Sequence, residues 1–215
     1  MTRNPMTPTE KATRATAQDV TKRSDLVFSR REVADFAGVS LQTVDKAIEQ
    51  RVLPKRRAQK ETVISEDGLA VMVVLSHAKL DLPVKVKQRV GKWIVTERPF
   101  AKKKAPPLRL SEVLMITLPE PVRQVIAEAE AYVVDRGRFV ATDPHIFGGQ
   151  PVIAGTRIPV HTIAERLEAG DTLDTLAEDY PHVERRALEI AARYARTHPR
   201  RGRPVKPWRD SPSRA

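Results

Sequence analysis

The sequence contains no cysteine and few aromatic residues, and both scarcities limit what the protein can be. Without cysteine there are no disulfides, no thiolate metal sites and no cysteine nucleophiles, which fits a reducing compartment. Aromatic side chains make up only 5% of the 215 residues, so the predicted core is aliphatic. The longest apolar run, Leu69 to Leu75, is far below the roughly 20 residues of a membrane-spanning helix. The first residues hold no apolar stretch of signal-peptide type. We therefore expect a soluble, cytoplasmic protein with no membrane contact.

Basic residues are in excess, but they are unevenly distributed. The formal net charge of +11 divides into +10 over residues 1–104, −5 over 105–195 and +6 over 196–215. A basic segment suits a polyanion, because each phosphate that is neutralised releases a counterion. The acidic middle does not suit one. Different partners are therefore expected for different parts of the chain.

Shifts in composition divide the chain into five segments. Residues 1–25 are polar without an apolar period and are predicted to be disordered, whereas residues 26–97 form a first compact unit. Residues 98–107 (RPFAKKKAPP) combine three lysines with two closing prolines, which is typical of a linker. A second unit follows at 108–197, and a basic, extended tail at 198–215. The expected fold class is mainly α, with short strands in both units.

The pattern around Gly38 is that of two short helices joined by a tight turn. Residues 29–32 have the form of a capping box, which starts a helix that runs to about Phe36. Gly38 supplies the positive φ of the turn, and Ser40 caps a second helix that ends near residue 50. The predicted inward face consists of Val33, Ala37, Val39, Val44, Ala47 and Ile48. The predicted outward face consists of Leu41, Gln42, Asp45, Lys46 and Glu49. These are the features of a helix-turn-helix whose second helix enters a major groove.

A basic stretch after the second helix predicts a wing. Residues 52–54 and 62–64 can pair as a hairpin around the polar loop 55–60, beside the groove. With helices expected at 65–80 and 84–95, this half resembles the winged helix-turn-helix of the mercury-resistance-regulator (MerR) superfamily. The resemblance implies binding of double-stranded operator DNA. Base edges and phosphates are expected to be contacted by Arg30, Arg31, Ser40, Gln42, Thr43, Lys46, Lys55, Arg56 and Arg57.

An ordinary three-helix domain is the alternative to a DNA reader, with basic residues that only keep it soluble. Spacing alone does not separate the two, but spacing, capping, wing and charge together favour DNA binding. Asp45 and Glu49 act against it, because they repel phosphate unless they face base amino groups or a partner.

Glycine and proline are concentrated in residues 143–160 (DPHIFGGQPVIAGTRIPV). Gly148 and Gly149 predict a tight turn, and residues 154–155 form the tip of a short hairpin between 152–153 and 157–158. Three helices are expected to follow, over 161–169, 172–179 (capped by Asp171) and 183–195. Over about residues 138–197 this pattern is similar to the family named domain of unknown function 433, whose members include VapB-type antitoxins.

The order of the two halves is similar to that of VapB-type antitoxins that accompany a toxin with a PIN-like ribonuclease fold. The resemblance implies a type II antitoxin that neutralises such a toxin and represses its own operon. Guanidinium groups of the tail suit the clustered carboxylates of that fold. The residues expected to contact the toxin are Arg200, Arg201, Arg203, Lys206, Trp208 and Arg209. If the tail is only a solvated end, the acidic second domain must carry the contact. A stand-alone MerR-like transcription regulator is the alternative function.

Other kinds of site are not favoured by the sequence. A phosphate-binding loop at the GTRIPV segment lacks the Gly-Lys-Ser/Thr sequence, and Arg157 is expected to pair locally with Asp or Glu. The histidines at 145, 161, 182 and 198 match no metal-site spacing. No catalytic residue, metal or cofactor is therefore expected.

A homodimer, or a hetero-oligomer with the toxin, is expected because one recognition helix reads only a few base pairs. The helix at 84–95 and the second unit are the candidate interfaces.

Overall fold

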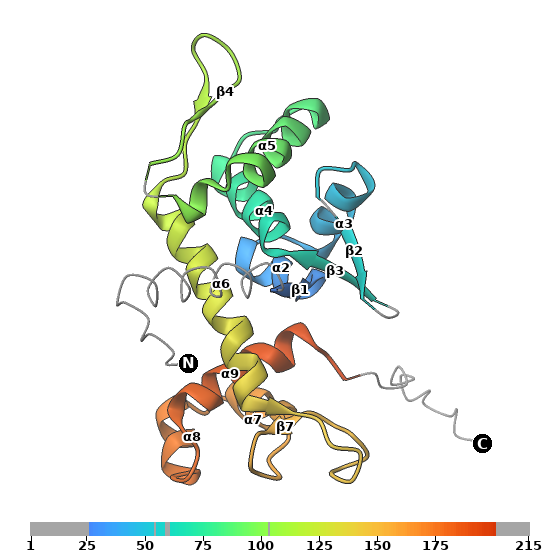
Figure 1. Ribbon diagram of the computed structural model, residues 1–215. Coiled ribbons are helices and arrows are strands. Elements are labelled where there is room, and N and C mark those ends of the chain that lie inside the picture. The colour runs from blue at the N-terminus through green and yellow to red at the C-terminus, as the bar shows by residue number, and fades with distance from the viewer. Residues whose placement is uncertain (1–25, 54, 59–60, 103, 201–215) are drawn as a thin grey trace, which may run out of the picture.

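The computed structural model of the protein describes residues 26–53, 55–58, 61–102 and 104–200 and is mainly helical (Figure 1). Its helices are α2 (Arg30–Ala37), α3 (Leu41–Glu49), α4 (Glu66–Ala78), α5 (Val84–Glu97), α6 (Glu120–Phe139), α7 (Val160–Glu168), α8 (Leu173–Asp179) and α9 (Arg185–Thr197), with a 3₁₀ turn η1 (Pro99–Ala101). The strands are β1 (Val27–Ser29), β2 (Lys55–Ala58), β3 (Glu61–Ser65), β4 (Leu108–Arg109), β5 (Met115–Ile116), β6 (Val140–Ala141) and β7 (Val152–Ile153). The predicted fold class is confirmed. Within the described residues, no helix has both the length and the apolar character to cross a bilayer.

The first two helices form as their caps predict. Ser29 accepts a hydrogen bond from the backbone N–H of Glu32 at 3.2 Å, and the Glu32 carboxylate accepts one from the N–H of Ser29 at 2.7 Å. Gly38 follows α2 with φ of 63°. Ser40 then caps α3 by accepting from the N–H of Thr43 at 3.2 Å. These local bonds set the turn between the two helices.

The wing is a three-stranded antiparallel sheet with the strand order β1-β3-β2, and its register differs from the prediction. The basic residues 55–58 are not a loop: they form β2, which pairs with residues 61–64 of β3. Residues 52–53 are not a strand, because Val52 and Leu53 are buried and both donate their N–H groups to the carbonyl of Ala47. Burial of two apolar side chains against the end of α3 delays the strand until Lys55.

α5 passes very close to the residues that follow α3. A Cβ placed on Gly91 lies 2.6 Å from the carbonyl oxygen of Val52, so only glycine fits there. One turn earlier, the side-chain amide of Gln88 donates to the carbonyl of Gln50 at 2.8 Å. These contacts hold α3 from its C-terminal end.

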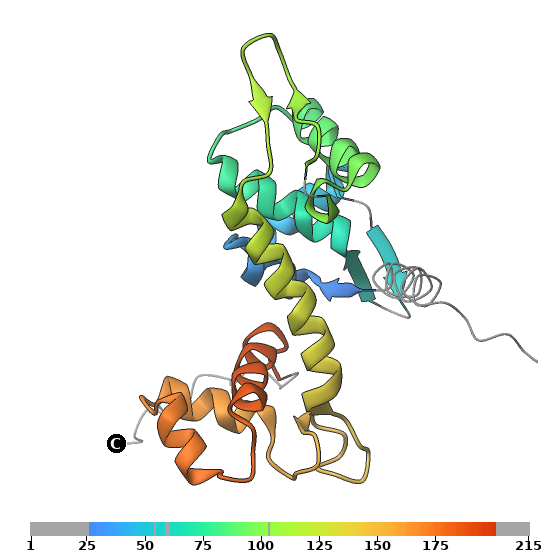
Figure 2. The same cartoon turned by 60° about the vertical axis from the view of Figure 1, so that its left-hand side comes forward.

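The long helix α6 connects the two halves of the molecule (Figure 2). It runs to Phe139 and packs against both α4 and α9. Its side chains Ile126, Ala129 and Tyr132 are buried in one continuous cluster that extends from Phe28 to Ala195. The division into 26–97 and 108–197 stays a prediction, and the apolar core spans both segments.

The predicted linker is attached to α6. The guanidinium of Arg123 donates to the carbonyls of Pro99 at 2.7 Å and Lys102 at 3.0 Å. Farther along, the antiparallel strands β4 and β5 form a hairpin that projects from the end of the molecule (Figure 1).

The C-terminal part places the expected turns and helices, with one additional strand pairing and one correction. Gly148, Gly149 and Gly155 all have positive φ. β7 pairs with β6. The second arm of the expected hairpin also lies antiparallel to β7, through a bridge between Val152 and Pro159 and a hydrogen bond from Ile153 N–H to the carbonyl of Ile158 at 2.9 Å. Thr172, not Asp171, caps α8, because the Asp171 carboxylate pairs with Arg166 at 2.5 Å.

Candidate nucleic-acid interface

α3 has one buried and one exposed side, as a recognition helix requires. Val44 and Ala47 are buried against the rest of the domain. Gln42, Thr43 and Lys46 are exposed on the other side. A helix fixed by packing and presenting polar groups at neighbouring positions can place them against base edges.

The start of α3 presents two hydroxyl groups. The side chains of Ser40 and Thr43 are exposed and lie 2.9 Å apart, within hydrogen-bonding distance. Hydroxyls next to a helix N-terminus suit phosphate or base contacts, since the free N–H groups there favour anions.

Arg30 and Asp45 form an ion pair across the two helices, with 2.6 Å between Nη1 and Oδ1. Both groups are partly exposed. Arg30 was expected to contact a phosphate, but in the free protein its guanidinium pairs with the carboxylate of Asp45. The same pair neutralises Asp45, which answers the objection that this residue repels phosphate. Arg31 is exposed and forms no ion pair with any other described residue.

The strand β2 brings Lys55, Arg56 and Arg57 to the edge of the three-stranded sheet, next to β3. The structure describes the backbone of these residues only. Their strand is the outer strand of this sheet, and its register is not the expected one.

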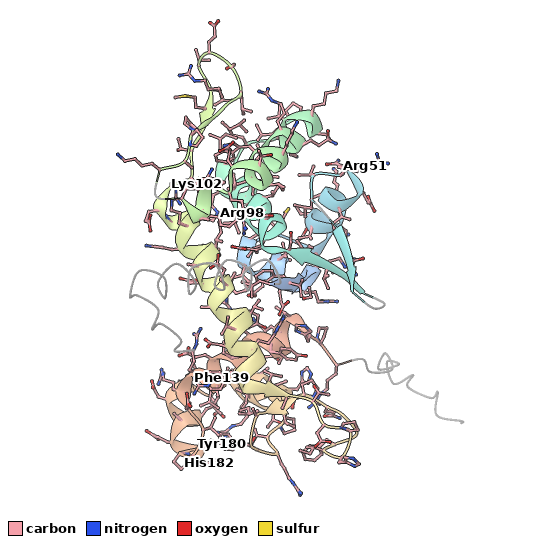
Figure 3. All side chains as sticks on the ribbon, viewed as in Figure 1. Arg51, Arg98, Lys102, Phe139, Tyr180 and His182 are labelled. Atoms are coloured by element: carbon pink, nitrogen blue, oxygen red, sulfur yellow. The ribbon has the colours of Figure 1, made fainter. Side chains whose placement is uncertain are left out.

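Arg51 was not among the residues expected from the sequence to form the candidate interface. It follows α3 and is exposed (Figure 3). Its backbone has φ of 56°, a left-handed conformation that ends the helix without glycine. No local motif distinguishes this arginine, because its position depends on where α3 stops.

A buried ion pair holds α2 against α6. The carboxylate of Glu32 is fully buried and pairs with Arg136, which also donates to the carbonyl of Val27 at 3.3 Å. Tyr132, one turn before Arg136, is buried too. Burial and the nearby Glu32 charge raise the pKa of Tyr132 well above its ordinary value, so it stays neutral.

The last helix also contacts the helix-turn-helix. Asp35 of α2 pairs with Arg193 at 3.5 Å and with Arg196 at 3.3 Å, both from α9. The guanidinium of Arg193 lies 4.3 Å from the centre of the Phe36 ring, a cation–π contact. The C-terminal part thus contacts α2, the helix that precedes α3.

Acidic groups gather where α4 begins. The Glu66 carboxylate is buried, 2.7 Å from Arg98, and lies near Glu130 of α6. Burial and the Glu130 carboxyl raise the pKa of Glu66 to about 8, against the lowering effect of Arg98. Glu66 is therefore largely protonated at neutral pH.

The GTRIPV segment forms a tight turn. The Thr156 hydroxyl donates to the carbonyl of Ile153 at 2.8 Å and accepts from the N–H of Ile158 at 3.0 Å. The local pairing expected for Arg157 does not occur, because this exposed side chain meets no carboxylate among the described residues. Instead, the acidic groups of this half pair with Arg166, Arg185 and Arg186.

The residues expected to bind a toxin fall mostly outside the described residues. Arg200 is described; it is exposed and pairs with Glu165 of α7 at 3.0 Å. Arg201, Arg203, Lys206, Trp208 and Arg209 lie beyond the described part of the chain. Within that part, no three histidine or carboxylate side chains are grouped as metal ligands. Burial lowers the pKa of His161, and the charge of Arg200 adds to this effect.

Comparisons with known proteins define the class of the C-terminal part. Residues 140–195 match the family described as "Protein of unknown function (DUF433)", so this segment is a DUF433 domain. Over 65 residues the chain is 37% identical to "Uncharacterized protein y4eO" of Sinorhizobium fredii (strain NBRC 101917 / NGR234). The match spans 30% of this chain and 29% of that relative, so the chain covers less than a third of its length. The X-ray crystal structure of Rv2018 from Mycobacterium tuberculosis is similar over 76% of this chain and 95% of that one, with 15% identity and a TM-score of 0.35.

Proposed function

We propose that the protein binds double-stranded operator DNA through α3 and the wing and acts as a transcriptional repressor. The observation that carries the proposal is α3 itself, which exposes Gln42, Thr43 and Lys46 while Val44 and Ala47 are buried. A basic strand, β2, lies in the adjoining sheet. The basic N-terminal half gives this surface the charge that phosphate binding needs.

Alanine variants separate base readout from phosphate contact. Gln42→Ala and Lys46→Ala should relax sequence preference at a cost of about 1–3 kcal/mol for the operator, whereas Arg56→Ala and Arg57→Ala should weaken binding to all sequences. Each phosphate contact that is lost should also lower the salt slope by about one.

The matched control is Arg138→Ala, which removes an exposed arginine paired with Glu184 in the C-terminal part. It should bind DNA as the wild type does. The measurement is binding to operator and unrelated duplexes over a range of salt concentrations. Unchanged footprints for all four variants would mean that α3 is not the reading element.

The biological role we propose is that of an antitoxin, which neutralises a PIN-like ribonuclease and represses the operon that encodes both. The sequence resemblance to VapB-type antitoxins supports this role, together with a DUF433 domain at residues 140–195. Truncation after Thr197 tests it: binding of the toxin should fall by orders of magnitude while operator binding changes little. If the truncated chain still neutralises the toxin, the DUF433 domain carries the contact.

A stand-alone MerR-like regulator is the second candidate. It is favoured by the contacts of α9 with α2, through which a ligand of the C-terminal part would reach the DNA-binding element. The two candidates differ in gene context. An antitoxin has a reading frame for a PIN-like protein overlapping or next to its own.

A further inference from the structure

The β4–β5 hairpin exposes apolar side chains at its tip. The exposed fraction is 94% for Val113 and 51% for Met115. The strands contain two residues each, and so small a sheet has little stability of its own. It is attached to the body by Arg89, which donates to the carbonyl of Arg109 at 3.0 Å, and by Leu108 and Ile116, which pack against the core. Just before the hairpin, Trp93 donates to the carbonyl of Pro106 at 3.2 Å. A projecting apolar tip of this kind needs a partner surface.

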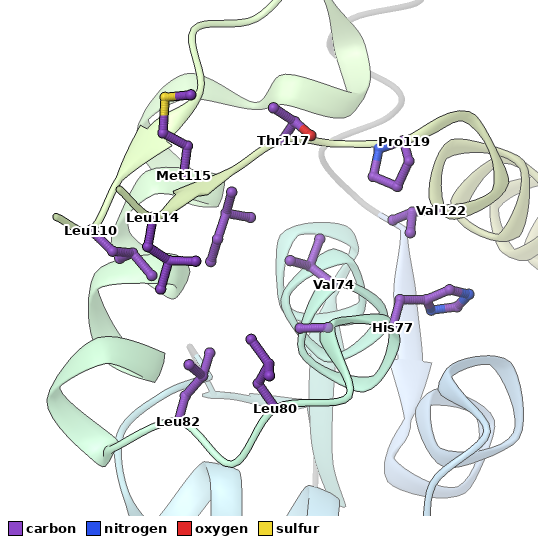
Figure 4. A pocket seen from close by; sticks show the side chains of 12 residues that line it. Val74, His77, Leu80, Leu82, Leu110, Leu114, Met115, Thr117, Pro119 and Val122 are labelled. Atoms are coloured by element: carbon purple, nitrogen blue, oxygen red, sulfur yellow. The ribbon is translucent and has the colours of Figure 1, made fainter. Parts of the chain in front are cut away.

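An apolar hollow lies directly beside this hairpin (Figure 4). Its volume is about 250 Å³, several times the roughly 30 Å³ that one water occupies in the liquid. The end of α4, the segment with Leu80 and Leu82, and Leu114 of the hairpin form its walls. Leu80 is 57% exposed at the rim, so the hollow can be reached from outside.

We infer that the hairpin and the hollow are the interface between two copies of this chain, each copy placing its Val113 tip in the hollow of the other. A two-fold interface requires one patch that contains both a shape and its complement, and this patch holds an apolar projection next to an apolar depression.

The charges on the hairpin agree with a second copy as the occupant. Arg109 and Glu112 flank the tip, are both exposed, and form no ion pair inside the described part of the chain. A two-fold interface that sets Arg109 of one copy against Glu112 of the other satisfies both charges. Two such pairs form at once, and like charges are kept apart.

This interface differs from the ones expected from the sequence, which were α5 and the C-terminal unit. Val84, at the start of α5, is 38% exposed, so the first turn of α5 also carries an accessible apolar side chain. The inference does not depend on DNA binding. It gives the proposed repressor a means of presenting two recognition helices to two half-sites.

Sedimentation of the full-length chain at micromolar concentration, without DNA, tests the inference. The wild type should be a dimer, and Val113→Asp should raise its dissociation constant by roughly 100-fold or more, because an unpaired carboxylate cannot be buried in the hollow. The control is Val134→Asp, which alters an equally apolar side chain on α6 that is 64% exposed. It should remain dimeric. A monomeric wild type, or a Val113→Asp variant as dimeric as the control, overturns the inference.

The absence of cysteine permits a second test that does not depend on a disruptive variant. Chains with Val113→Cys and chains with Leu80→Cys are mixed and oxidised. The mixture should give a mixed disulfide in higher yield than a mixture of Val134→Cys with Leu80→Cys. Equal disulfide yields in the two mixtures would overturn the inference that the Val113 tip of one copy lies in the hollow of the other. Neither test uses DNA, so failure here is distinct from failure of the α3 variants to alter DNA binding.

Discussion

At the scale of single residues, Asp45 offers a direct test of the proposed DNA-binding surface. Its carboxylate is partly exposed on α3 and pairs with Arg30. Removing the charge of Asp45 therefore also releases the guanidinium of Arg30. Asp45→Asn should raise affinity for DNA of any sequence and steepen the salt slope by about one, because Arg30 becomes free for a phosphate. Stability should change by less than about 1 kcal/mol, since the pair is partly exposed.

The control for Asp45 is Asp174→Asn, which removes a carboxylate paired with Arg185 in the C-terminal part. This variant should bind DNA as the wild type does. Weaker binding of Asp45→Asn to the operator alone would show instead that the carboxylate accepts hydrogen bonds from base amino groups.

Glu66 makes stability depend on pH. Its pKa is about 8 in the folded protein and 4.5 ordinarily, so the folded state holds a proton that the unfolded state releases between these values. The stabilisation is complete below about pH 4.5, and it is lost as pH rises through 8. Glu66→Gln, which does not titrate, should make the free energy of unfolding less dependent on pH across this window.

Urea unfolding at pH 5, 6.5 and 8 measures the effect of Glu66→Gln. An exposed carboxylate, changed in Glu178→Gln, serves as the control and should leave the pH profile as in the wild type. Parallel profiles for the wild type and Glu66→Gln would contradict the assignment.

At the scale of helices and strands, the parts with local signals could be predicted from the sequence. The capping box at Ser29 and Glu32, the glycine at 38 and the cap at Ser40 act within three residues, and α2 and α3 formed as expected. The wing register could not be predicted, because it depends on Val52 and Leu53 packing against other elements. The cap of α8 likewise depends on a side-chain contact: Asp171 pairs with Arg166, and Thr172 caps the helix instead.

The ion pair between α2 and α6 is expected to be the most sensitive polar contact between helices. Arg136→Ala leaves the fully buried Glu32 carboxylate without its partner and should destabilise the fold by about 3–5 kcal/mol. Arg186→Ala removes an exposed arginine paired with Asp135 and should cost about 1 kcal/mol or less. Chemical unfolding gives both values.

The double variant Glu32→Gln with Arg136→Met separates loss of the pair from burial of a lone charge. It should be more stable than Arg136→Ala, because no uncompensated charge remains. A double variant less stable than Arg136→Ala would contradict that explanation.

At the scale of the whole molecule, the exposure of side chains on a single helix could be predicted from the sequence, whereas contacts between elements could not. The exposed residues of α3 follow from its helical period, whereas the pairing of Arg30 with Asp45 needs two helices to be packed. The contacts of Asp35 with Arg193 and Arg196 join segments more than 150 residues apart. No spacing within the chain indicates such contacts, because they depend on how α6 brings the two halves together.

Continuity of the core across α6 predicts that the two halves unfold together. Ile126, Ala129 and Tyr132 of α6 belong to the same buried cluster as the helix-turn-helix and α9, and Glu32 needs Arg136 from that helix. Scanning calorimetry should give one transition with equal calorimetric and van't Hoff enthalpies. A fragment of residues 26–97 should not fold stably, because it lacks α6 and leaves the Glu32 carboxylate unpaired. Two separate transitions, or a fragment that melts cooperatively at the temperature of the whole chain, would show that the halves are independent units.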